Sequence, residues 1–374
     1  MDKLHEYINL IVKIGVNIRA GQKLLIWCSA DTASFAGMAM EAAYSAGADN
    51  VEIYLEKSDP DSNLTIDRGK EKRWIDDGYR MLWLYAPDPK SPKYIQWKMP
   101  ALPWTFACVP TPNWAGMVFP HKKYEKDAVD LLWESIFAAC RINENNTEEI
   151  WLKHINTLQA KVDALMKYSF RSLRLKNSLG TDLFIDLPHN HVWLSCVNKT
   201  KSGDRFIANI PTEEVFTAPL RTGVNGVVYA SRPFVFMGET INGIRLEFEN
   251  GKIVGYSAKK NQHLLEKFLA SYKNANYLGE VALVPHSSPI SRMNLFWYES
   301  SFDENASCHI AFGHGYPQTI KDTSGKDEQK LLAMELNQSP VHEDLMIGTA
   351  DTEITGTTQN NHPVSIFSNG EWRI

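Results

Sequence analysis

The segment VHEDLMI, residues 341–347, places a histidine and an aspartate two positions apart within an otherwise largely apolar stretch. Alternate residues of a strand share a face, so His342 and Asp344 point to one side while Glu343 points to the other. A neutral imidazole beside a carboxylate suits hard or borderline cations. The spacing is compatible with metal binding, but on spacing alone the solvated polar face of a surface strand is the favoured interpretation.

Three further places carry side chains of the same chemical kinds. Glu280 opens the apolar run of YLGEVALVP, where a carboxylate caps, pairs or ligates unless the strand end is solvated. His309 stands among small and apolar residues in ENASCHIAFG and could equally be a core histidine. Glu213 and Glu214 precede an apolar pair, and one of them can be buried only beside a counter-charge. With the first pair, these positions gather three carboxylates and two histidines in one predicted domain.

Other candidate groups have weaker patterns. His286 follows the strand of Glu280 and could reach the same site, or lie in a loop. His189 and His191 would share a face if extended, which would make an accidental metal site. Serine hydrolysis is not expected, because no GxSxG elbow surrounds Ser287, Ser288 or Ser291. The N-terminal region has neither GxGxxG nor a Walker motif, which disfavours nucleotide binding.

The secondary structure expected from the sequence differs between the two halves of the chain. The first 55 residues predict helix, strand, helix and strand, and further strands are expected at 79–85 and 105–109. Strands that alternate with helices indicate a parallel sheet flanked by helices. Amphipathic helices follow at 127–139 and 147–167, the second long enough to link two domains.

After residue 167 short strand-like runs alternate with turn signals. Asn250-Gly251 is a strong hairpin signal, because both positions of its turn need positive φ. We expect an α/β fold overall: an N-terminal α/β scaffold domain, 1–167, and a mostly β (α+β) metal-binding domain, 168–374. Two helices are expected in the second domain, near 263–275 and 327–337.

Composition excludes several classes of protein. The 374 residues are 44% hydrophobic and 22% charged, with a formal net charge of -5, so no basic field for nucleic acid exists. The five cysteines are odd in number and form no CxxC pair, which fits a reducing compartment. No apolar run approaches the ~18–20 residues that cross a bilayer. The N-terminus lacks the apolar core of a signal peptide, so a cytoplasmic location without membrane association is expected.

Four segments together resemble the aminopeptidase T family of bacterial metallo-exopeptidases, which includes the enzymes called aminopeptidase S. They are NIPTEEVFTAP (209–219), YLGEVALVPHSSPIS (277–291), SFDENASCHIAFGHGYP (301–317) and HEDLMIGTAD (342–351). The runs IVKIGVNIRAGQKLLI and VPTPNWAGMVFP in the first half are similar to it too, so the resemblance covers most of the chain. The stretch 56–103 is shorter than in typical members.

The resemblance implies a site residue by residue. Glu214, Glu280 and Asp344 would hold one divalent metal ion, and Glu280, His309 and His342 the second, with Glu280 as the bridging carboxylate. Glu214 is preferred to Glu213 because it directly precedes the Val-Phe-Thr of the family's order. Tyr316, seven residues after His309, matches the family's active-site tyrosine. Zinc is the first choice of ion, with cobalt, manganese and magnesium as alternatives.

The implied activity is metal-dependent release of N-terminal residues from peptides that have a free N-terminus. A metal-activated water would attack the scissile carbonyl, and Tyr316 would donate a hydrogen bond to the oxyanion. Glu213 could act as a proton shuttle, but strand alternation points it away from Glu214. A homodimer is also implied. The alternatives are a catalytically silent peptide- or metal-binding protein, or a different dinuclear hydrolase such as an amidase.

Overall fold

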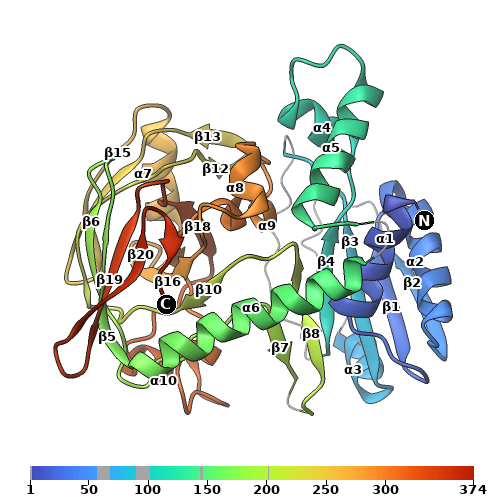
Figure 1. The fold of residues 1–374 in the computed structure, drawn as a ribbon, viewed down its shortest axis with the longest axis horizontal. Coiled ribbons are helices and arrows are strands. Elements are labelled where there is room, and N and C mark those ends of the chain that lie inside the picture. The colour runs from blue at the N-terminus through green and yellow to red at the C-terminus, as the bar shows by residue number, and fades with distance from the viewer. Residues whose placement is uncertain (1, 57–67, 90–101, 144–145, 201) are drawn as a thin grey trace. The chain divides into compact units, whose positions relative to one another are not determined.

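The computed structural model describes residues 2–56, 68–89, 102–143, 146–200 and 202–374. The expected shortening of 56–103 falls largely on residues 57–67 and 90–101, which lie outside the described residues. The chain forms two compact units (Figure 1). The first consists of Met1–Asn156, Cys196–Thr212 and Trp297–Ser301, and the second of the remaining segments.

The first unit contains a five-stranded parallel sheet in the order β2-β1-β3-β4-β9. Its strands are β1 (Lys23–Cys28), β2 (Asn50–Leu55), β3 (Tyr79–Tyr85), β4 (Trp104–Cys108) and β9 (Asn209–Ile210). Its helices are α1 (Lys3–Asn9), continued by a π-helix over Leu10–Gly15, then a 3-10 turn over Ala30–Thr32, α2 (Ala33–Ser45), α3 (Arg68–Asp76), α4 (Pro112–Val118) and α5 (Glu125–Ala139). A short hairpin joins β7 (Val197–Lys199) to β8 (Arg205–Ile207).

Burial explains why the short apolar runs of this unit are strands. Leu24, Leu25 and Ile26 of β1 have no exposed surface, as expected for the centre of a parallel sheet. Helix α2 contacts β1 and β2 and buries the small side chains Ala36 and Ala39. The mixed α/β class expected from the sequence is therefore present.

The two units interleave along the chain, whereas the expected domains 1–167 and 168–374 make a single division. Helix α6 (Thr147–Tyr168) begins in the first unit and ends in the second. Strand β9 pairs with β4, which returns residues 196–212 to the first sheet. The paired residues Phe106 and Asn209 are 103 positions apart, so the pairing leaves no local sequence signal.

The second unit contains an eight-stranded antiparallel sheet, a four-stranded antiparallel sheet and a two-stranded one. The large sheet has the order β15-β14-β11-β6-β5-β19-β20-β21, formed by β5 (Phe170–Lys176), β6 (Asp182–Asp186), β11 (Val224–Tyr229), β14 (Arg245–Glu249), β15 (Lys252–Ser257), β19 (Glu353–Thr358), β20 (Pro363–Ser368) and β21 (Glu371–Trp372). The small pair is β12 (Phe234–Phe236) and β13 (Glu239–Ile241). The helices are α7 (Gln262–Ser271), α8 (Pro289–Met293), α9 (Ser300–Asp303), which runs on from the first unit, and α10 (Glu328–Ala333), with 3-10 turns over Glu304–Ala306 and Pro317–Thr319.

The turn between β14 and β15 confirms the hairpin expected from the sequence. Asn250 and Gly251 adopt φ values of 48° and 81°, the left-handed region that this turn requires. A Cβ on Gly251 would lie 1.8 Å from the carbonyl oxygen of Arg221, so the position also needs glycine for close approach.

The four-stranded sheet has the order β10-β16-β17-β18: β10 (Val215–Thr217), β16 (Leu278–Leu283), β17 (His309–Gly313) and β18 (His342–Met346). One face of it is apolar, because Val281, Ile310 and Leu345 are in register and have no exposed surface. The opposite face carries the ionisable side chains described below. Within the described residues, no helix has the length and apolar character needed to span a membrane.

Candidate metal centre

Strand register brings together the ionisable residues of β16, β17 and β18. Glu280 pairs with Ala311, and Ala311 pairs with Asp344, so these three residues form a row across the sheet. His309 and His342 lie two residues from Ala311 and Asp344 on their own strands and therefore share the same face. Ala311 has only a methyl side chain, so it leaves space between the carboxylates of Glu280 and Asp344 for a bound ion.

A bulge at Gly279 sets the position of Glu280. The register shifts between Leu278 and Glu280, so Gly279 is an extra residue on β16. A Cβ on Gly279 would lie 2.1 Å from the carbonyl oxygen of His314. Only glycine fits this close backbone approach, which explains the Gly-Glu sequence at the start of the strand.

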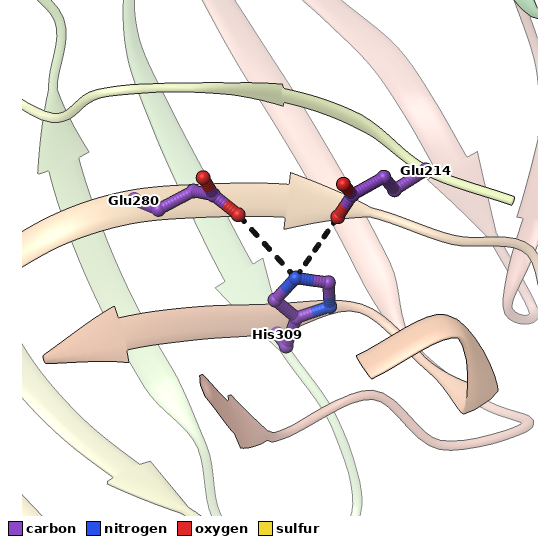
Figure 2. A group of neighbouring side chains, drawn as sticks. All are labelled: Glu214, Glu280 and His309. Atoms are coloured by element: carbon purple, nitrogen blue, oxygen red, sulfur yellow. Dashed lines mark ion pairs between the residues drawn. The ribbon is translucent and has the colours of Figure 1, made fainter. Parts of the chain in front are cut away.

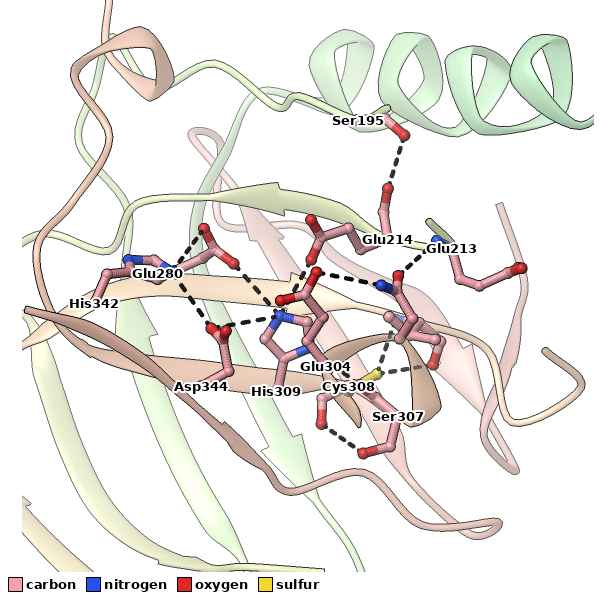
Figure 3. Close-up of polar contacts among 12 residues, drawn as sticks. Ser195, Glu213, Glu214, Glu280, Glu304, Ser307, Cys308, His309, His342 and Asp344 are labelled. Atoms are coloured by element: carbon pink, nitrogen blue, oxygen red, sulfur yellow. Dashed lines mark hydrogen bonds and ion pairs between the residues drawn. The ribbon is translucent and has the colours of Figure 1, made fainter. Parts of the chain in front are cut away.

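Glu214 enters the cluster from the segment before β10. The backbone carbonyl of Glu214 accepts a hydrogen bond of 2.7 Å from Ser195 Oγ, and β10 pairs with β16. The backbone N–H of Glu213 donates to Asn305 Oδ1 at 2.6 Å. Figure 3 shows the Glu213 side chain directed away from the other carboxylates. The alternation of the chain thus sends Glu214, and not Glu213, toward the cluster.

Figure 2 shows the carboxylates of Glu214 and Glu280 directed at the ring of His309, and Figure 3 shows His342 and Asp344 beside them. His309 Nε2 lies 3.1 Å from Glu214 Oε2, 3.4 Å from Glu280 Oε1 and 4.0 Å from Asp344 Oδ1. His342 Nε2 lies 3.4 Å from Asp344 Oδ1 and 3.9 Å from Glu280 Oε2. The two oxygens of Glu280 therefore face different histidines.

The potential ligand atoms fall into two groups that share Glu280. One group is Glu214, Glu280 and His309, and the other is Glu280, His342 and Asp344, each with ligand atoms within 4.8 Å of one another. The family resemblance implied a different division, with Asp344 beside Glu214 and both histidines together. The register explains the difference, because His342 and Asp344 are neighbours on one strand while His309 lies toward Glu214.

Backbone carbonyls orient both histidine rings. His309 Nδ1 lies 3.1 Å from the carbonyl oxygen of Ser307, and His342 Nδ1 lies 2.8 Å from that of His314. A carbonyl oxygen only accepts, so each Nδ1 carries a hydrogen and each Nε2 faces the carboxylates. Metal-ligating histidines commonly have this second hydrogen bond.

This orientation makes the cluster suitable for cations. A neutral His309 with its hydrogen on Nδ1 presents a lone pair at Nε2, 3.1 Å from the carboxylate oxygen Glu214 Oε2. Two acceptors at that distance repel each other unless a proton or a metal ion lies with them. Three carboxylates and two neutral imidazoles match the donor set of divalent metal ions.

Without a metal ion, protons must take the place of the cation, and the pKa values reflect this. Burial raises the pKa of Glu280 to about 7. Burial lowers the pKa of His342, but the Asp344 and Glu280 carboxylates outweigh it and raise that pKa to about 10. Burial raises the pKa of Asp344, but the His342 ring outweighs it and lowers that pKa to about 2. Buried carboxyl and imidazole groups thus share protons across the cluster.

Glu304 is a site residue that the sequence reasoning missed. Burial raises its pKa well above the usual value, and the Asp344 and Glu214 carboxylates add to the shift. Its carboxyl group hydrogen-bonds Asp344, and Figure 3 shows it beside His309. It lies five residues before His309 in a motif quoted for the resemblance, but no spacing rule marks it. Only the fold brings it to the other acids.

Tyr316 lies against the cluster. Its ring centroid is 4.7 Å from that of His342 and 6.2 Å from that of Phe216. Burial raises the pKa of the phenol well above 10, and the Glu280 carboxylate adds to the shift. The phenol therefore keeps its proton and can donate a hydrogen bond.

The other histidines considered from the sequence lie apart from this group. His286 is exposed, and its Nδ1 lies 3.2 Å from Ser291 Oγ. His191 is buried with Nδ1 2.7 Å from the carbonyl oxygen of Pro188, whereas His189 is exposed. Among the described residues, none of these three belongs to a group that could hold a metal ion.

Comparisons with known proteins agree with this chemistry. The sequence profile of the family described as Thermophilic metalloprotease (M29) matches residues 1–78 and 90–372. Aminopeptidase AmpS of Bacillus subtilis (strain 168) is 35% identical over 406 residues, covering 99% of this chain and 98% of that protein. Aminopeptidase 2 of Geobacillus stearothermophilus is 34% identical, covering 99% and 97%. The solved structure of wild-type AmpT from Thermus thermophilus superposes with a TM-score of 0.86 at 30% identity, covering 100% of this chain and 99% of that one.

Proposed function

The chain belongs to the thermophilic metalloprotease (M29) family and is a metallo-aminopeptidase, and from this premise we propose that it works through two divalent metal ions that share Glu280. Glu214 and His309 would complete one site, and His342 and Asp344 would complete the other. The observation that carries the proposal is that the two oxygens of Glu280 face two different histidines, at 3.4 and 3.9 Å.

Charge balance supports two ions rather than one. Ionised Glu214, Glu280, Glu304 and Asp344 bring four negative charges into a cluster whose members are mostly buried. Buried charges must be compensated, and one dication would leave a net negative charge among acids with little solvent. Two dications would balance the four carboxylates. Zinc is our first choice, because it accepts mixed imidazole and carboxylate ligands.

Divalent ions in such a site polarise a carbonyl oxygen and lower the pKa of water. The protein's own groups then move the protons. Glu304 accepts the proton of the attacking water and can return it to the leaving amine, the usual work of a general acid–base. Tyr316 keeps its phenolic proton and donates a hydrogen bond to the oxyanion that forms at the scissile carbonyl.

The substrates are peptides with a free N-terminus, in keeping with the names of the relatives. An α-amine in its neutral form is a further nitrogen ligand for a metal ion, and a carboxylate of the cluster can hold its protonated form. A homodimer and a cytoplasmic location complete the proposal, and each is open to direct measurement by sedimentation and by cell fractionation.

The decisive experiment measures metal content and activity together. Purified protein is stripped with a chelator, reloaded with zinc, cobalt, manganese or magnesium, and assayed on a panel of amino-acid p-nitroanilides. We expect two ions per chain by elemental analysis, no activity after stripping and recovery on reloading. Activity that survives complete stripping, or saturation at one ion per chain with full activity, would refute the two-ion centre. Peptide binding without product would instead favour the silent binding protein.

A further inference from the structure

The side chain of Asn305 connects two acidic segments of the candidate metal centre. It has no exposed surface, and its amide hydrogen-bonds to both segments. Oδ1 accepts from the backbone N–H of Glu213 at 2.6 Å, and Nδ2 donates to Glu304 Oε1 at 3.2 Å. Glu213 directly precedes Glu214, so one amide touches both the segment of Glu214 and the carboxylate of Glu304.

The order of these two bonds is fixed by the backbone. The N–H of Glu213 can only donate, so the oxygen of the Asn305 amide must face it. The NH₂ group must then face Glu304, where a carboxylate oxygen accepts. The bond from Glu213 therefore orients the Asn305 amide so that its NH₂ group donates to Glu304.

Asn305 is itself anchored. Its backbone carbonyl accepts a hydrogen bond of 3.1 Å from Ser288 Oγ. The same hydroxyl accepts from the backbone N–H of Ser291 at 3.1 Å, as the cap of helix α8. A residue fixed through both its backbone and its side chain loses little further freedom when it orients Glu304.

The neutrality of the amide matters as much as its geometry. The cluster already contains the carboxylates of Glu214, Glu280, Glu304 and Asp344. A lysine or arginine at position 305 would neutralise Glu304 and compete with metal ions, and an aspartate would repel it. An amide donates a hydrogen bond to Glu304 without adding a charge to the cluster.

We propose that Asn305 is a positioning residue that sets the Glu214 segment and the Glu304 carboxylate at their places in the metal centre. The proposal rests on the proposed function for its catalytic consequence, but the contact itself can be tested in metal-free protein.

The first test is a double-mutant cycle followed by thermal melting of metal-free protein. Asn305→Asp keeps the acceptor for Glu213 and replaces the donor to Glu304 by a second carboxylate, so the Tm should fall by about 2–4 °C or more. In Glu304→Gln protein the same substitution should lose at least half of that effect, because the new amide donates to the new carboxylate. Equal falls in both backgrounds would overturn the proposal, since residues in contact couple and independent ones add.

The second test measures metal affinity and catalysis on the full chain. Asn305→Leu removes both bonds and should weaken zinc binding, measured by chelator competition, about 10–100-fold. Asn305→Asp should keep zinc affinity closer to wild type and lower kcat on leucine p-nitroanilide with little change in KM. Wild-type affinity and kcat in the leucine variant would refute the role. If that variant does not fold, the melting cycle decides alone.

Asn177→Asp is the matched control. This half-buried amide also bonds on both sides. Its Nδ2 donates to the carbonyl of Ile347 at 2.9 Å, and its Oδ1 accepts from the N–H groups of Leu179 at 3.1 Å and Thr181 at 3.4 Å. The substitution should leave zinc affinity and kcat unchanged. If wild-type protein binds none of zinc, cobalt, manganese and magnesium, the proposed function fails, whereas the melting cycle still reports on Asn305.

Discussion

Replacing Glu280 by glutamine should stabilise the metal-free protein and abolish most of the stabilisation that metal ions give. Glu280 is 4% exposed, and burial raises its pKa to about 7. The same carboxylate supplies one oxygen to each of the two potential ligand groups. Its charge is therefore unfavourable in the empty cluster, and we expect it to be needed for metal binding.

The magnitude for the metal-free protein follows from the pKa. The carboxyl group binds its proton more tightly in the folded chain than in the unfolded chain, where the ordinary value is 4.5. The cost of ionising it in the fold is small below that value and complete above pH 7. At pH 8 this amounts to about 3 kcal/mol, and at pH 5 to less than about 1 kcal/mol. Glutamine removes the cost, which raises the Tm at pH 8 by roughly 4 °C.

The magnitude for the loaded protein follows from mass action. An ion at one hundred times its dissociation constant stabilises the folded protein by about 2.7 kcal/mol. Loss of a charged ligand common to both groups should weaken each site by about a hundredfold, which cancels this gain. The activity on amino-acid p-nitroanilides should fall with the metal content.

The assay is thermal melting of wild type and Glu280→Gln at pH 5 and pH 8, each with a chelator and with zinc, with elemental analysis of the same samples. The variant should melt higher than wild type with the chelator at pH 8, similarly at pH 5, and without response to zinc. A variant that melts lower than wild type in chelator at pH 8, or that keeps the full zinc response, would refute the reasoning.

Three further outcomes are expected. Tyr316→Phe should lower kcat about 10²–10³-fold with unchanged metal content, as loss of an oxyanion donor does, and steady-state kinetics would show an unaltered kcat if the role is wrong. Gly279→Ala should lower both the Tm and the zinc affinity, because its Cβ would lie 2.1 Å from a backbone oxygen. The control Gly37→Ala in helix α2, whose Cβ would meet nothing within 4 Å, should leave the zinc affinity intact and keep or raise the Tm. Equal behaviour of the two variants would contradict the bulge argument. Zinc affinity should rise between pH 6 and pH 9, and calorimetry should detect proton release on binding. The reason is that the raised pKa values of His342 and Glu280 leave protons on the metal-free protein, which the ion must displace. Binding that does not depend on pH would contradict this reasoning.

Local sequence patterns were sufficient to predict several secondary-structure features of the protein. The run KLLIWC becomes strand β1 because its apolar side chains are buried in a parallel sheet. The Asn250-Gly251 pair forms its hairpin because the turn requires positive φ at both residues. His342 and Asp344 lie on one face because the strand period is two. These outcomes depend on residues within a few positions of one another.

The division of the potential ligands into two groups could not be predicted in that way. It depends on Ala311 lying between Glu280 and Asp344, which is a matter of register between strands some 30 residues apart in the chain. The bulge at Gly279 shifts that register by one residue, and no local pattern distinguishes it from a regular strand.

The sequence by itself determined which metal-ligating side chains this protein has, its mixed α/β class and its likeness to metallo-exopeptidases. Only the tertiary structure decided that Glu304 and Asn305 join the cluster and that residues 196–212 return to the first sheet. The reason is physical: side-chain chemistry and local periodicity are properties of neighbouring residues, whereas burial, proton sharing and strand register arise from contacts between distant segments.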